Sequence, residues 1–222
     1  RTIAVEPLPT EQLRQLCQYR HIPLVEACIS DVDGFVNIYV GTFDGEENLN
    51  VSSMRSDWWG STTSAKRVYS MSLPTFLDRM KVRQILCLKI DTEGMEFPII
   101  QGLAALQSSL LPQVLMFEYG GGGTRENGQG GWEEDIFKGT VESLKILHNL
   151  GYQQTIMIDS APGTKEQVFE LASIIKDPAT IFPPQSIYGN IITLRNVRYS
   201  EDEIHRIGQR YRDNQRTPPT VN

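Results

Sequence analysis

Three carboxylates follow an apolar run in the segment KIDTEGMEF, residues 89–97. Asp91, Glu93 and Glu96 come shortly after ILCL, which has the unbroken apolar character of a buried strand. Charged groups are costly to bury without partners, so their crowding at a strand end indicates chemistry. The alternative is helix capping, in which Asp91 or Thr92 caps the next helix and Glu93 or Glu96 complements its dipole.

A carboxylate placed at such a strand end can act as a general base toward an alcohol. Asp91 is the first candidate for this role and Glu93 the second, and Lys89 is expected to pair with one of them. Glu118 ends a later strand, LMFEY, and adds a fourth carboxylate. Asp91, Glu93 and Glu118 could instead hold Mg²⁺, because this hard cation prefers oxygen ligands.

Two earlier strand ends also carry carboxylates. Glu6 ends the run TIAVE, where a carboxylate can accept hydrogen bonds from two ribose hydroxyls, and Pro7 would offer a flat apolar face to a base. Asp31 follows the run CIS and could accept from an exocyclic amine while Ile29 packs against the ring. A solvated strand end for Glu6 and an Asp-Gly turn cap for Asp31 are the simpler alternatives.

The elements that must position these residues alternate between β-rich runs and helical periods. This alternation predicts one α/β domain over residues 1–199, with a mostly parallel central sheet, helices on both faces and an antiparallel last strand. A short exposed helix over 201–211 and a frayed end complete the segment 200–222. The expected strands are 2–5, 22–30, 35–43, 85–91, 113–119, 152–159 and 190–195, and the expected helices are 10–19, 73–80, 97–110 and 140–151.

Two segments, 51–67 and 120–135, interrupt this order and are expected to be loops. The first carries Trp58 and Trp59 among hydroxyl residues, a combination that suits a sugar ring, although one Trp could simply anchor the loop. The second is rich in glycine and lacks the GK[ST] of a phosphate loop. We expect it to be a mobile lid with Trp132 at its far end, or alternatively a disordered connector.

Composition excludes several classes of partner. The formal net charge of −6 argues against a broad nucleic-acid-binding face, and no apolar stretch approaches the length needed to span a membrane. The three cysteines, Cys17, Cys28 and Cys87, are scattered singly, which favours a reducing cytoplasm over a disulfide framework or a zinc site. Nothing in the sequence indicates the oligomeric state.

Five segments together resemble one known family. They are VEP, ACISDVDG, SLPTFLD, LKIDTEGMEFPIIQG and VLMFEY, within residues 3–120, and the fourth is the specific one. In order and approximate spacing they are similar to the FkbM-type S-adenosylmethionine-dependent methyltransferases. The resemblance implies a Rossmann-like class I methyltransferase fold and S-adenosyl-L-methionine as the cofactor. It also implies that Glu6 holds the ribose, that Asp31 with Ile29 and Ser30 holds the adenine, and that Asp91 lies beside the methyl donor.

The chain departs from this family at its start. No glycine-rich first strand precedes TIAVEP, and that strand lies at the centre of the family's sheet. Its absence would leave two apolar strands with unpaired edges, which is an aggregation hazard. We therefore expect either upstream residues or another segment to complete the sheet, and poor cofactor binding by these residues alone.

The resemblance implies an O-methyltransferase acting on a hydroxyl of a carbohydrate, a glycosylated or a polyketide-like natural product. Trp58, Trp59 and Glu118 would meet this small-molecule acceptor. One alternative is a non-catalytic or degenerate partner domain of the same fold. Another is a metal-dependent hydrolase or transferase that binds a cation with Asp91, Glu93 and Glu96. A nicotinamide dehydrogenase is disfavoured, because the strand end KIDTEG has no evident role in hydride transfer.

Overall fold

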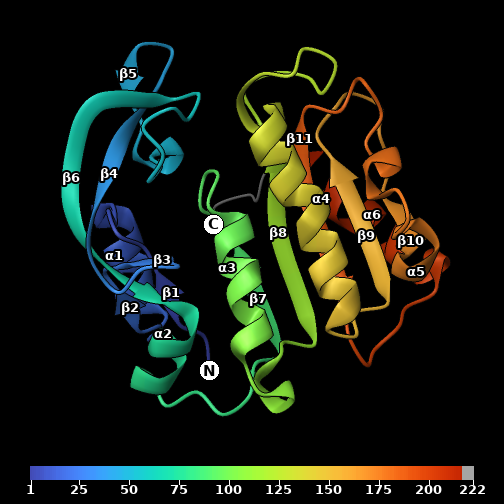
Figure 1. The fold of residues 1–222 in the computed structure, drawn as a ribbon, viewed down its shortest axis with the longest axis horizontal. Coiled ribbons are helices and arrows are strands. Elements are labelled where there is room, and N and C mark those ends of the chain that lie inside the picture. Colours follow the sequence, from blue (N-terminus) through green and yellow to red (C-terminus); the bar gives the residue numbers. More distant parts are fainter. Residues whose placement is uncertain (217–222) are drawn as a thin grey trace.

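The computed structural model describes residues 1–216, and its strands form three separate sheets (Figure 1). The largest sheet has the order β10 (Gln167–Glu170), β9 (Gln154–Asp159), β11 (Tyr188–Leu194), β8 (Val114–Gly120) and β7 (Cys87–Ile90). β7 and β8 run parallel, whereas β11 is antiparallel to both of its neighbours, as expected of the closing strand. The α/β class is confirmed, but the mostly parallel sheet is wrong, because β7–β8 is the one parallel pair among these five strands.

The other two sheets lie on the N-terminal side of the molecule. One has the order β3 (Cys28–Ser30), β6 (Ser61–Ser72), β4 (Gly34–Phe43) and β5 (Glu46–Glu47), and the other pairs β1 (Ala4–Val5) with β2 (Leu24–Val25). The loop predicted for 51–67 is wrong in its second half, because Ser61–Arg67 belong to β6. This strand pairs with β4 and exposes most of that half, so its side chains are polar and its apolar signal is weak.

The sheet is interrupted between β1 and β7. β1 pairs with β2 and β7 pairs with β8, and no strand within residues 1–216 joins the two pairs. The open edge of β7 is exposed to solvent, and Leu86 beside it is 65% exposed. Within residues 1–216, β1 and β7 therefore each lie at the edge of a separate sheet.

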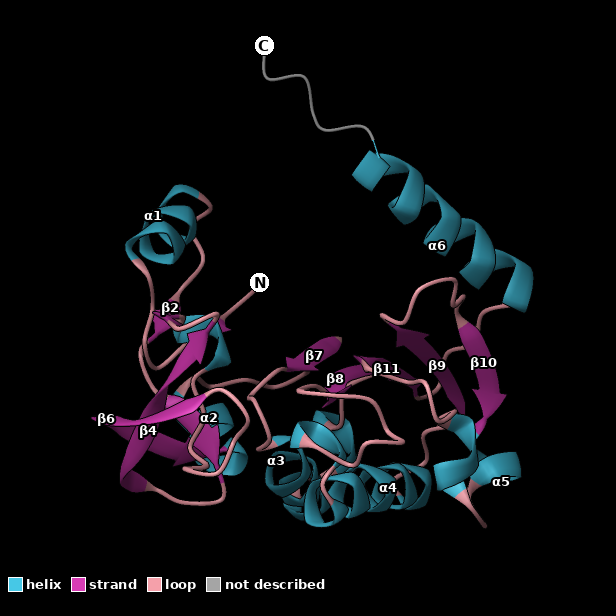
Figure 2. Cartoon of the chain, turned by 90° about the horizontal axis from the view of Figure 1, so that it is seen from above, coloured by secondary structure: helices cyan, strands magenta, loops and turns pink. Residues whose placement is uncertain are grey.

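Six α-helices cover the sheets. They are α1 (Glu11–Tyr19), α2 (Leu73–Arg79), α3 (Glu96–Gly102), α4 (Glu134–Asn149), α5 (Leu171–Ile174) and α6 (Glu201–Arg216), counted over residues 1–216. Viewed from above, α3 and α4 lie on one side of the five-stranded sheet and α6 on the other (Figure 2). The helix predicted for 97–110 ends early at Gly102, where 3-10 turns follow, and the one predicted from residue 140 begins already at Glu134.

The core fills the space between the five-stranded sheet and helices α3 and α4. Leu115 and Phe117 of β8, Ile100 of α3, and Leu144 and Leu147 of α4 are each at most 1% exposed. Burial of such a side chain contributes about 1.5–3 kcal/mol. This core fixes the β7 and β8 ends that carry the acidic residues.

α6 packs on the opposite face of the sheet through Ile204, which contacts Ile156 and Leu194. The helix predicted for 201–211 is confirmed and extends to Arg216, whereas the frayed end predicted beyond it lies in 217–222, outside the described residues. The division of the chain at residue 199 stays a prediction. Within residues 1–216 there is no helix with the length and apolar character required to cross a membrane.

Candidate active site

Acidic side chains meet at the adjoining ends of β7 and β8. Ile90 of β7 pairs with Phe117 of β8, so the next residues along the two strands, Asp91 and Glu118, are neighbours. Together with Glu93 they place carboxylate oxygens within 4.8 Å of one another. The sequence therefore predicted a group of residues that the fold does bring together.

Asp91 and Glu118 lie close enough for each to shift the pKa of the other. Burial, the contact with Asp91 and the other nearby carboxylates all raise the pKa of Glu118. Burial also acts to raise the pKa of Asp91, but hydrogen bonds from Glu118 and Lys89 outweigh it and hold this pKa below its usual range. Lys89 forms the expected ion pair with Asp91. The raised pKa of Glu118 and the lowered pKa of Asp91 therefore describe one pair of carboxyl groups that titrates together.

Glu93 has an unusual backbone and an unusual acidity. Its φ of 52° lies in the left-handed region, which is uncommon for a residue other than glycine. Burial raises the pKa of Glu93 to about 7, with contributions from the charges of Asp91 and Glu96. A hydrogen bond of 3.0 Å from the indole Nε1 of Trp58 to the Glu93 Oε2 acts in the opposite direction. Glu93 is therefore a carboxyl group that titrates near neutral pH.

Glu96 has a structural role. Its Oε1 accepts hydrogen bonds from the amide (2.7 Å) and hydroxyl (2.9 Å) of Thr92, and its Oε2 accepts from the amide of Gly94 (3.1 Å). These bonds satisfy donors in the turn that leads into α3, which is the capping alternative considered above. Glu96 is not in the group of carboxylates whose oxygens lie within 4.8 Å of one another, and its role as a cation ligand stays a prediction.

A small cavity lies beside these carboxyl groups. Glu93, Glu118 and Trp58 line it together with Thr140 of α4, and its volume is about 10 Å³. A space of this size holds about one water molecule. A single hydroxyl group fits in it.

Among the residues expected to bind a cofactor, Glu6 lies near the acidic group. Glu6 is half-buried and accepts a 2.9 Å hydrogen bond from the amide of Leu8 through Oε1. Burial raises the pKa of Glu6, the Leu8 bond opposes this, and the charge of Asp91 adds to it. The pKa of Cys28 on β3 is raised mainly by burial, and the charge of Glu6 raises it further. The end of β1 therefore lies within electrostatic reach of both the start of β3 and the end of β7.

The residues at the end of β3 and after β1 differ in accessibility. Asp31 is exposed, whereas Pro7 and Ile29 are half-buried and Ile29 packs against the main core. Ser30 is 2% exposed, and its hydroxyl bonds with that of Ser70 at 2.7 Å. The Ser30 side chain is therefore part of the protein interior, and the part of Ser30 in adenine binding stays a prediction.

The two adjacent tryptophans have different environments. Trp58 is 7% exposed, and a Cβ atom on Gly94 would come within 2.8 Å of its ring, so most of this ring is covered by the protein and its stacking role stays a prediction. Trp59 is 37% exposed and packs beside Gly122, where an added Cβ atom would lie 2.7 Å from the Trp59 Cγ. Trp59 is the more exposed of the pair, whereas Trp58 lines the small cavity beside Glu93.

The glycine-rich segment is a close crossing of two backbone stretches. A Cβ atom on Gly131 would lie 1.9 Å from the carbonyl oxygen of Gly120, and the amide of Gly131 donates to the carbonyl of Gly121 at 2.9 Å. Trp132 is 4% exposed, and its indole N–H donates to the carbonyl of Ile187 at 2.6 Å. Close packing accounts for these glycines, which form an ordered crossing, and the mobile lid stays a prediction.

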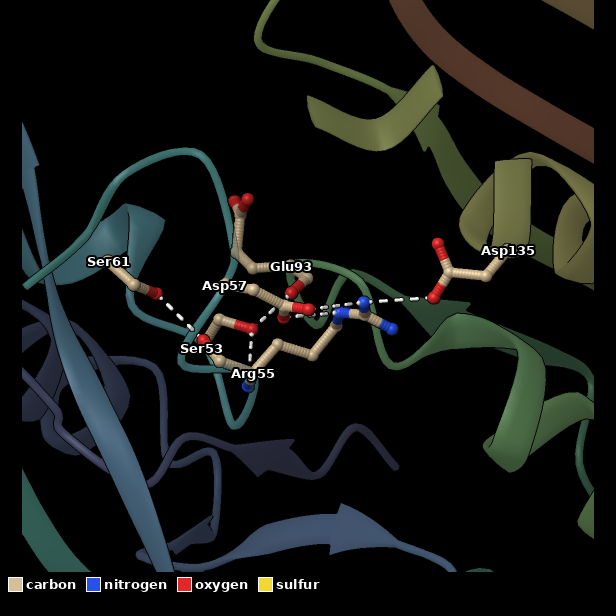
Figure 3. A network of polar contacts seen from close by, with 6 residues as sticks. All are labelled: Ser53, Arg55, Asp57, Ser61, Glu93 and Asp135. Carbon is tan, nitrogen blue, oxygen red and sulfur yellow. Dashed lines mark hydrogen bonds and ion pairs between the residues drawn. The ribbon is translucent and has the colours of Figure 1, made fainter. Parts of the chain in front are cut away.

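Sequence reasoning missed Asn190, Ser53 and Arg55. Asn190 lies directly opposite Glu118 in the β11–β8 register, so the two side chains share one face of the sheet. Its buried amide oxygen has no hydrogen-bond partner among the residues that the structure describes. A polar residue that opens the apolar strand NIITL was the available signal for it. Ser53 contacts Glu93 from the loop before β6, and Arg55 of the same loop bonds with Asp57 and Asp135 (Figure 3); no local pattern marked either residue.

Comparison with known families agrees with this geometry. The family described as "Methyltransferase FkbM domain" matches residues 1–153, which include Glu6, Asp91, Glu93 and Glu118. No curated protein matches the chain at a significant level. The match extends over more than half of the sequence and contains every strand end described above up to β8. The chain belongs to the FkbM methyltransferase family.

Proposed function

We propose that the chain is an S-adenosylmethionine-dependent O-methyltransferase whose acceptor is a hydroxyl of a carbohydrate, a glycosylated or a polyketide-like natural product. The family match supports methyl transfer. The observation that carries the hydroxyl specificity is the acidic group of Asp91, Glu93 and Glu118 beside a hydroxyl-sized cavity. Carboxylates in this position accept hydrogen bonds from an alcohol and can remove its proton.

The residues at the ends of β1 and β3 fit the cofactor's ribose and adenine. The Glu6 Oε1 accepts a hydrogen bond from the amide of Leu8. Its second oxygen would accept from the ribose hydroxyls. Asp31 is exposed just after β3. Pro7 after β1 and Ile29 in β3 are half-buried and offer apolar surface. The cofactor would supply an electrophilic methyl group. These residues would hold its nucleoside part and leave Asp91 at the reacting side.

Methyl transfer also requires that the acceptor hydroxyl loses its proton. Asp91 already accepts hydrogen bonds from Lys89 and Glu118, and its low pKa makes it a weak base. Glu93 has a pKa of about 7 and lines the cavity, which suits a group that must take up a proton at neutral pH. We therefore assign proton removal to Glu93 and orientation of the hydroxyl to Asp91, with Glu118 as a neutral neighbour that can donate a hydrogen bond.

A divalent cation is the second candidate for activating the hydroxyl. Three carboxyl groups within 4.8 Å form a set of hard oxygen donors of the kind that Mg²⁺ takes. Lys89 and the proton on Glu118 already offset much of this negative charge, which favours the metal-free route. Turnover measured after addition of EDTA, and again after addition of Mg²⁺, distinguishes the metal-free route from activation by a cation. Unchanged turnover supports the metal-free assignment, and turnover restored by Mg²⁺ supports the cation.

The decisive experiment is transfer of a labelled methyl group to a panel of hydroxylated acceptors, with titration calorimetry of S-adenosylhomocysteine in parallel. Transfer that is lost in Asp91→Asn while binding is kept would support the proposal. Binding without transfer to any acceptor would favour a non-catalytic domain. Metal-dependent hydrolysis that ignores S-adenosylmethionine would favour the metal-dependent alternative.

The same proposal includes a small-molecule acceptor and a cytoplasmic location. All three cysteines, Cys17, Cys28 and Cys87, carry free thiols, which suits a reducing compartment. The net charge of −6 suits a small acceptor better than a nucleic acid. Fractionation of the cells that express the protein tests its location.

A further inference from the structure

A loop before β6 spans from the four-stranded sheet to the acidic group, and we call residues 52–60 the strap. The backbone at Ser53 pairs with Tyr39 of β4, with N–O distances of 2.8 and 3.1 Å. At the other end, the amide of Thr42 donates to the carbonyl of Gly60 at 2.7 Å. The hydroxyl of Ser61 also donates to the carbonyl of Arg55 at 2.9 Å (Figure 3). The strap is therefore anchored to β4 at both ends.

The strap holds both the backbone and the side chain of Glu93. The hydroxyl of Ser53 donates to the carbonyl oxygen of Glu93 at 2.5 Å and accepts from the amide of Arg55 at 3.0 Å. The indole Nε1 of Trp58 donates to the Glu93 carboxylate at 3.0 Å. The left-handed backbone of Glu93 is thus fixed from outside its own segment, by residues about forty positions earlier in the chain.

The position of Trp58 is itself fixed. Gly94, with φ of 94°, leaves room for the indole ring against the β7–α3 turn. On the other side, Arg55 bonds with both carboxylate oxygens of Asp57, at 3.0 and 2.9 Å, and with Asp135 of α4 at 2.9 Å. The strap is therefore tied to the first turn of α4, and Trp58 has little freedom to move away from Glu93.

We propose that Trp58 is a positioning residue whose indole N–H holds the Glu93 carboxylate at the cavity beside Asp91 and Glu118. Without this donor, repulsion from Asp91 and Glu96 would favour rotation of the Glu93 side chain away from the acceptor hydroxyl. A hydrogen bond to a charged acceptor is directional and can select one orientation. The inference rests on the proposed function, because it assigns Trp58 a task in that reaction.

Trp58→Phe tests the kinetic side of this inference, because it removes the N–H and keeps an aromatic ring. We expect kcat to fall roughly 10- to 100-fold with the acceptor KM changed less than about twofold, since the loss affects the base and not binding. In a Glu93→Ala background the same substitution should cause no further loss. Trp59→Phe is the matched control, and its effect should be the same in both backgrounds. Equal losses from Trp58→Phe in both backgrounds would overturn the inference.

A spectroscopic test does not depend on turnover or on the folding of a Trp58 variant. The chain has three tryptophans, so an amide-type ¹H–¹⁵N spectrum shows three indole signals. Glu93→Ala should move the Trp58 indole signal upfield while those of Trp59 and Trp132 stay in place. An unmoved Trp58 signal would show that Trp58 only packs, and would overturn the inference. Absence of methyl transfer in the wild type would instead reject the proposed function, which the indole signal does not report.

Discussion

Glu118 and Asp91 lie side by side at the ends of the parallel strands β8 and β7, with carboxylate oxygens within 4.8 Å of each other. The contact follows from the register, since the residues before them, Ile90 and Phe117, are paired. Two carboxyl groups in such contact are stable together only when they share a proton. The pair therefore links the charge state of the site to the stability of the sheet end that carries it.

Replacement of Glu118 by Gln should make the protein less sensitive to high pH. The pKa of Glu118 is raised in the folded protein, so the folded state keeps a proton that the unfolded chain releases. Stability from this group is complete at pH values below about 4.5 and falls as the pH rises toward the folded pKa. Each tenfold difference in proton affinity between the folded and the unfolded state lowers the free energy of unfolding at high pH by about 1.4 kcal/mol.

Urea unfolding between pH 5 and 9 measures this difference. Relative to the wild type, Glu118→Gln should gain stability as the pH rises. The exposed Glu126→Gln serves as a control and should follow the wild type at every pH. Parallel curves for wild type and Glu118→Gln would contradict the shared proton.

Glu93 should control the pH dependence of the reaction. Because the pKa of Glu93 is about 7, the fraction able to accept a proton rises through neutral pH, and kcat should rise with it. Glu93→Gln should lower kcat roughly 100- to 10,000-fold and remove this rise. Steady-state rates from pH 5.5 to 9 at saturating substrates test both statements. A rise near pH 7 that persists in Glu93→Gln would assign the base to another group.

Glu6→Ala should weaken cofactor binding by about 1–3 kcal/mol, because a charged hydrogen-bond acceptor is lost. Calorimetric titration of S-adenosylhomocysteine measures this directly. Glu11→Ala on the exposed side of α1 is the control and should bind as the wild type does. Equal affinity in all three proteins would place the ribose away from the end of β1.

The sequence predicted the residues of the acidic group better than the sheets around it. Asp91, Glu93 and Glu118 were recognisable because each follows or ends an apolar run, and strand ends of one sheet meet. Strand β6 was missed because its first half is exposed and polar, so its pairing with β4 left no apolar alternation. The residue types within a segment were therefore enough to predict the acidic strand ends but not a strand whose first half is exposed.

The roles of the two tryptophans could not be told apart from sequence. Trp58 and Trp59 are adjacent and chemically identical, and what separates them is Glu93, which is 35 positions away from Trp58 and reached only in the folded chain. Asn190 was missed for the same reason, because its neighbour Glu118 lies on another strand. Such non-local contacts determine which polar residue serves the site and which serves the fold.

Trp59→Ala should raise the acceptor KM about 3- to 10-fold, the loss expected for one aromatic contact. The kcat should change little, because Trp59 is 37% exposed and has no contact with the acidic group among the hydrogen bonds of residues 1–216. Steady-state kinetics at saturating cofactor measure both constants, and unchanged circular dichroism and unfolding curves show that the fold is intact. An unchanged KM would mean that Trp59 only packs on Gly121 and Gly122, and the acceptor would then have to be recognised elsewhere on the strand ends.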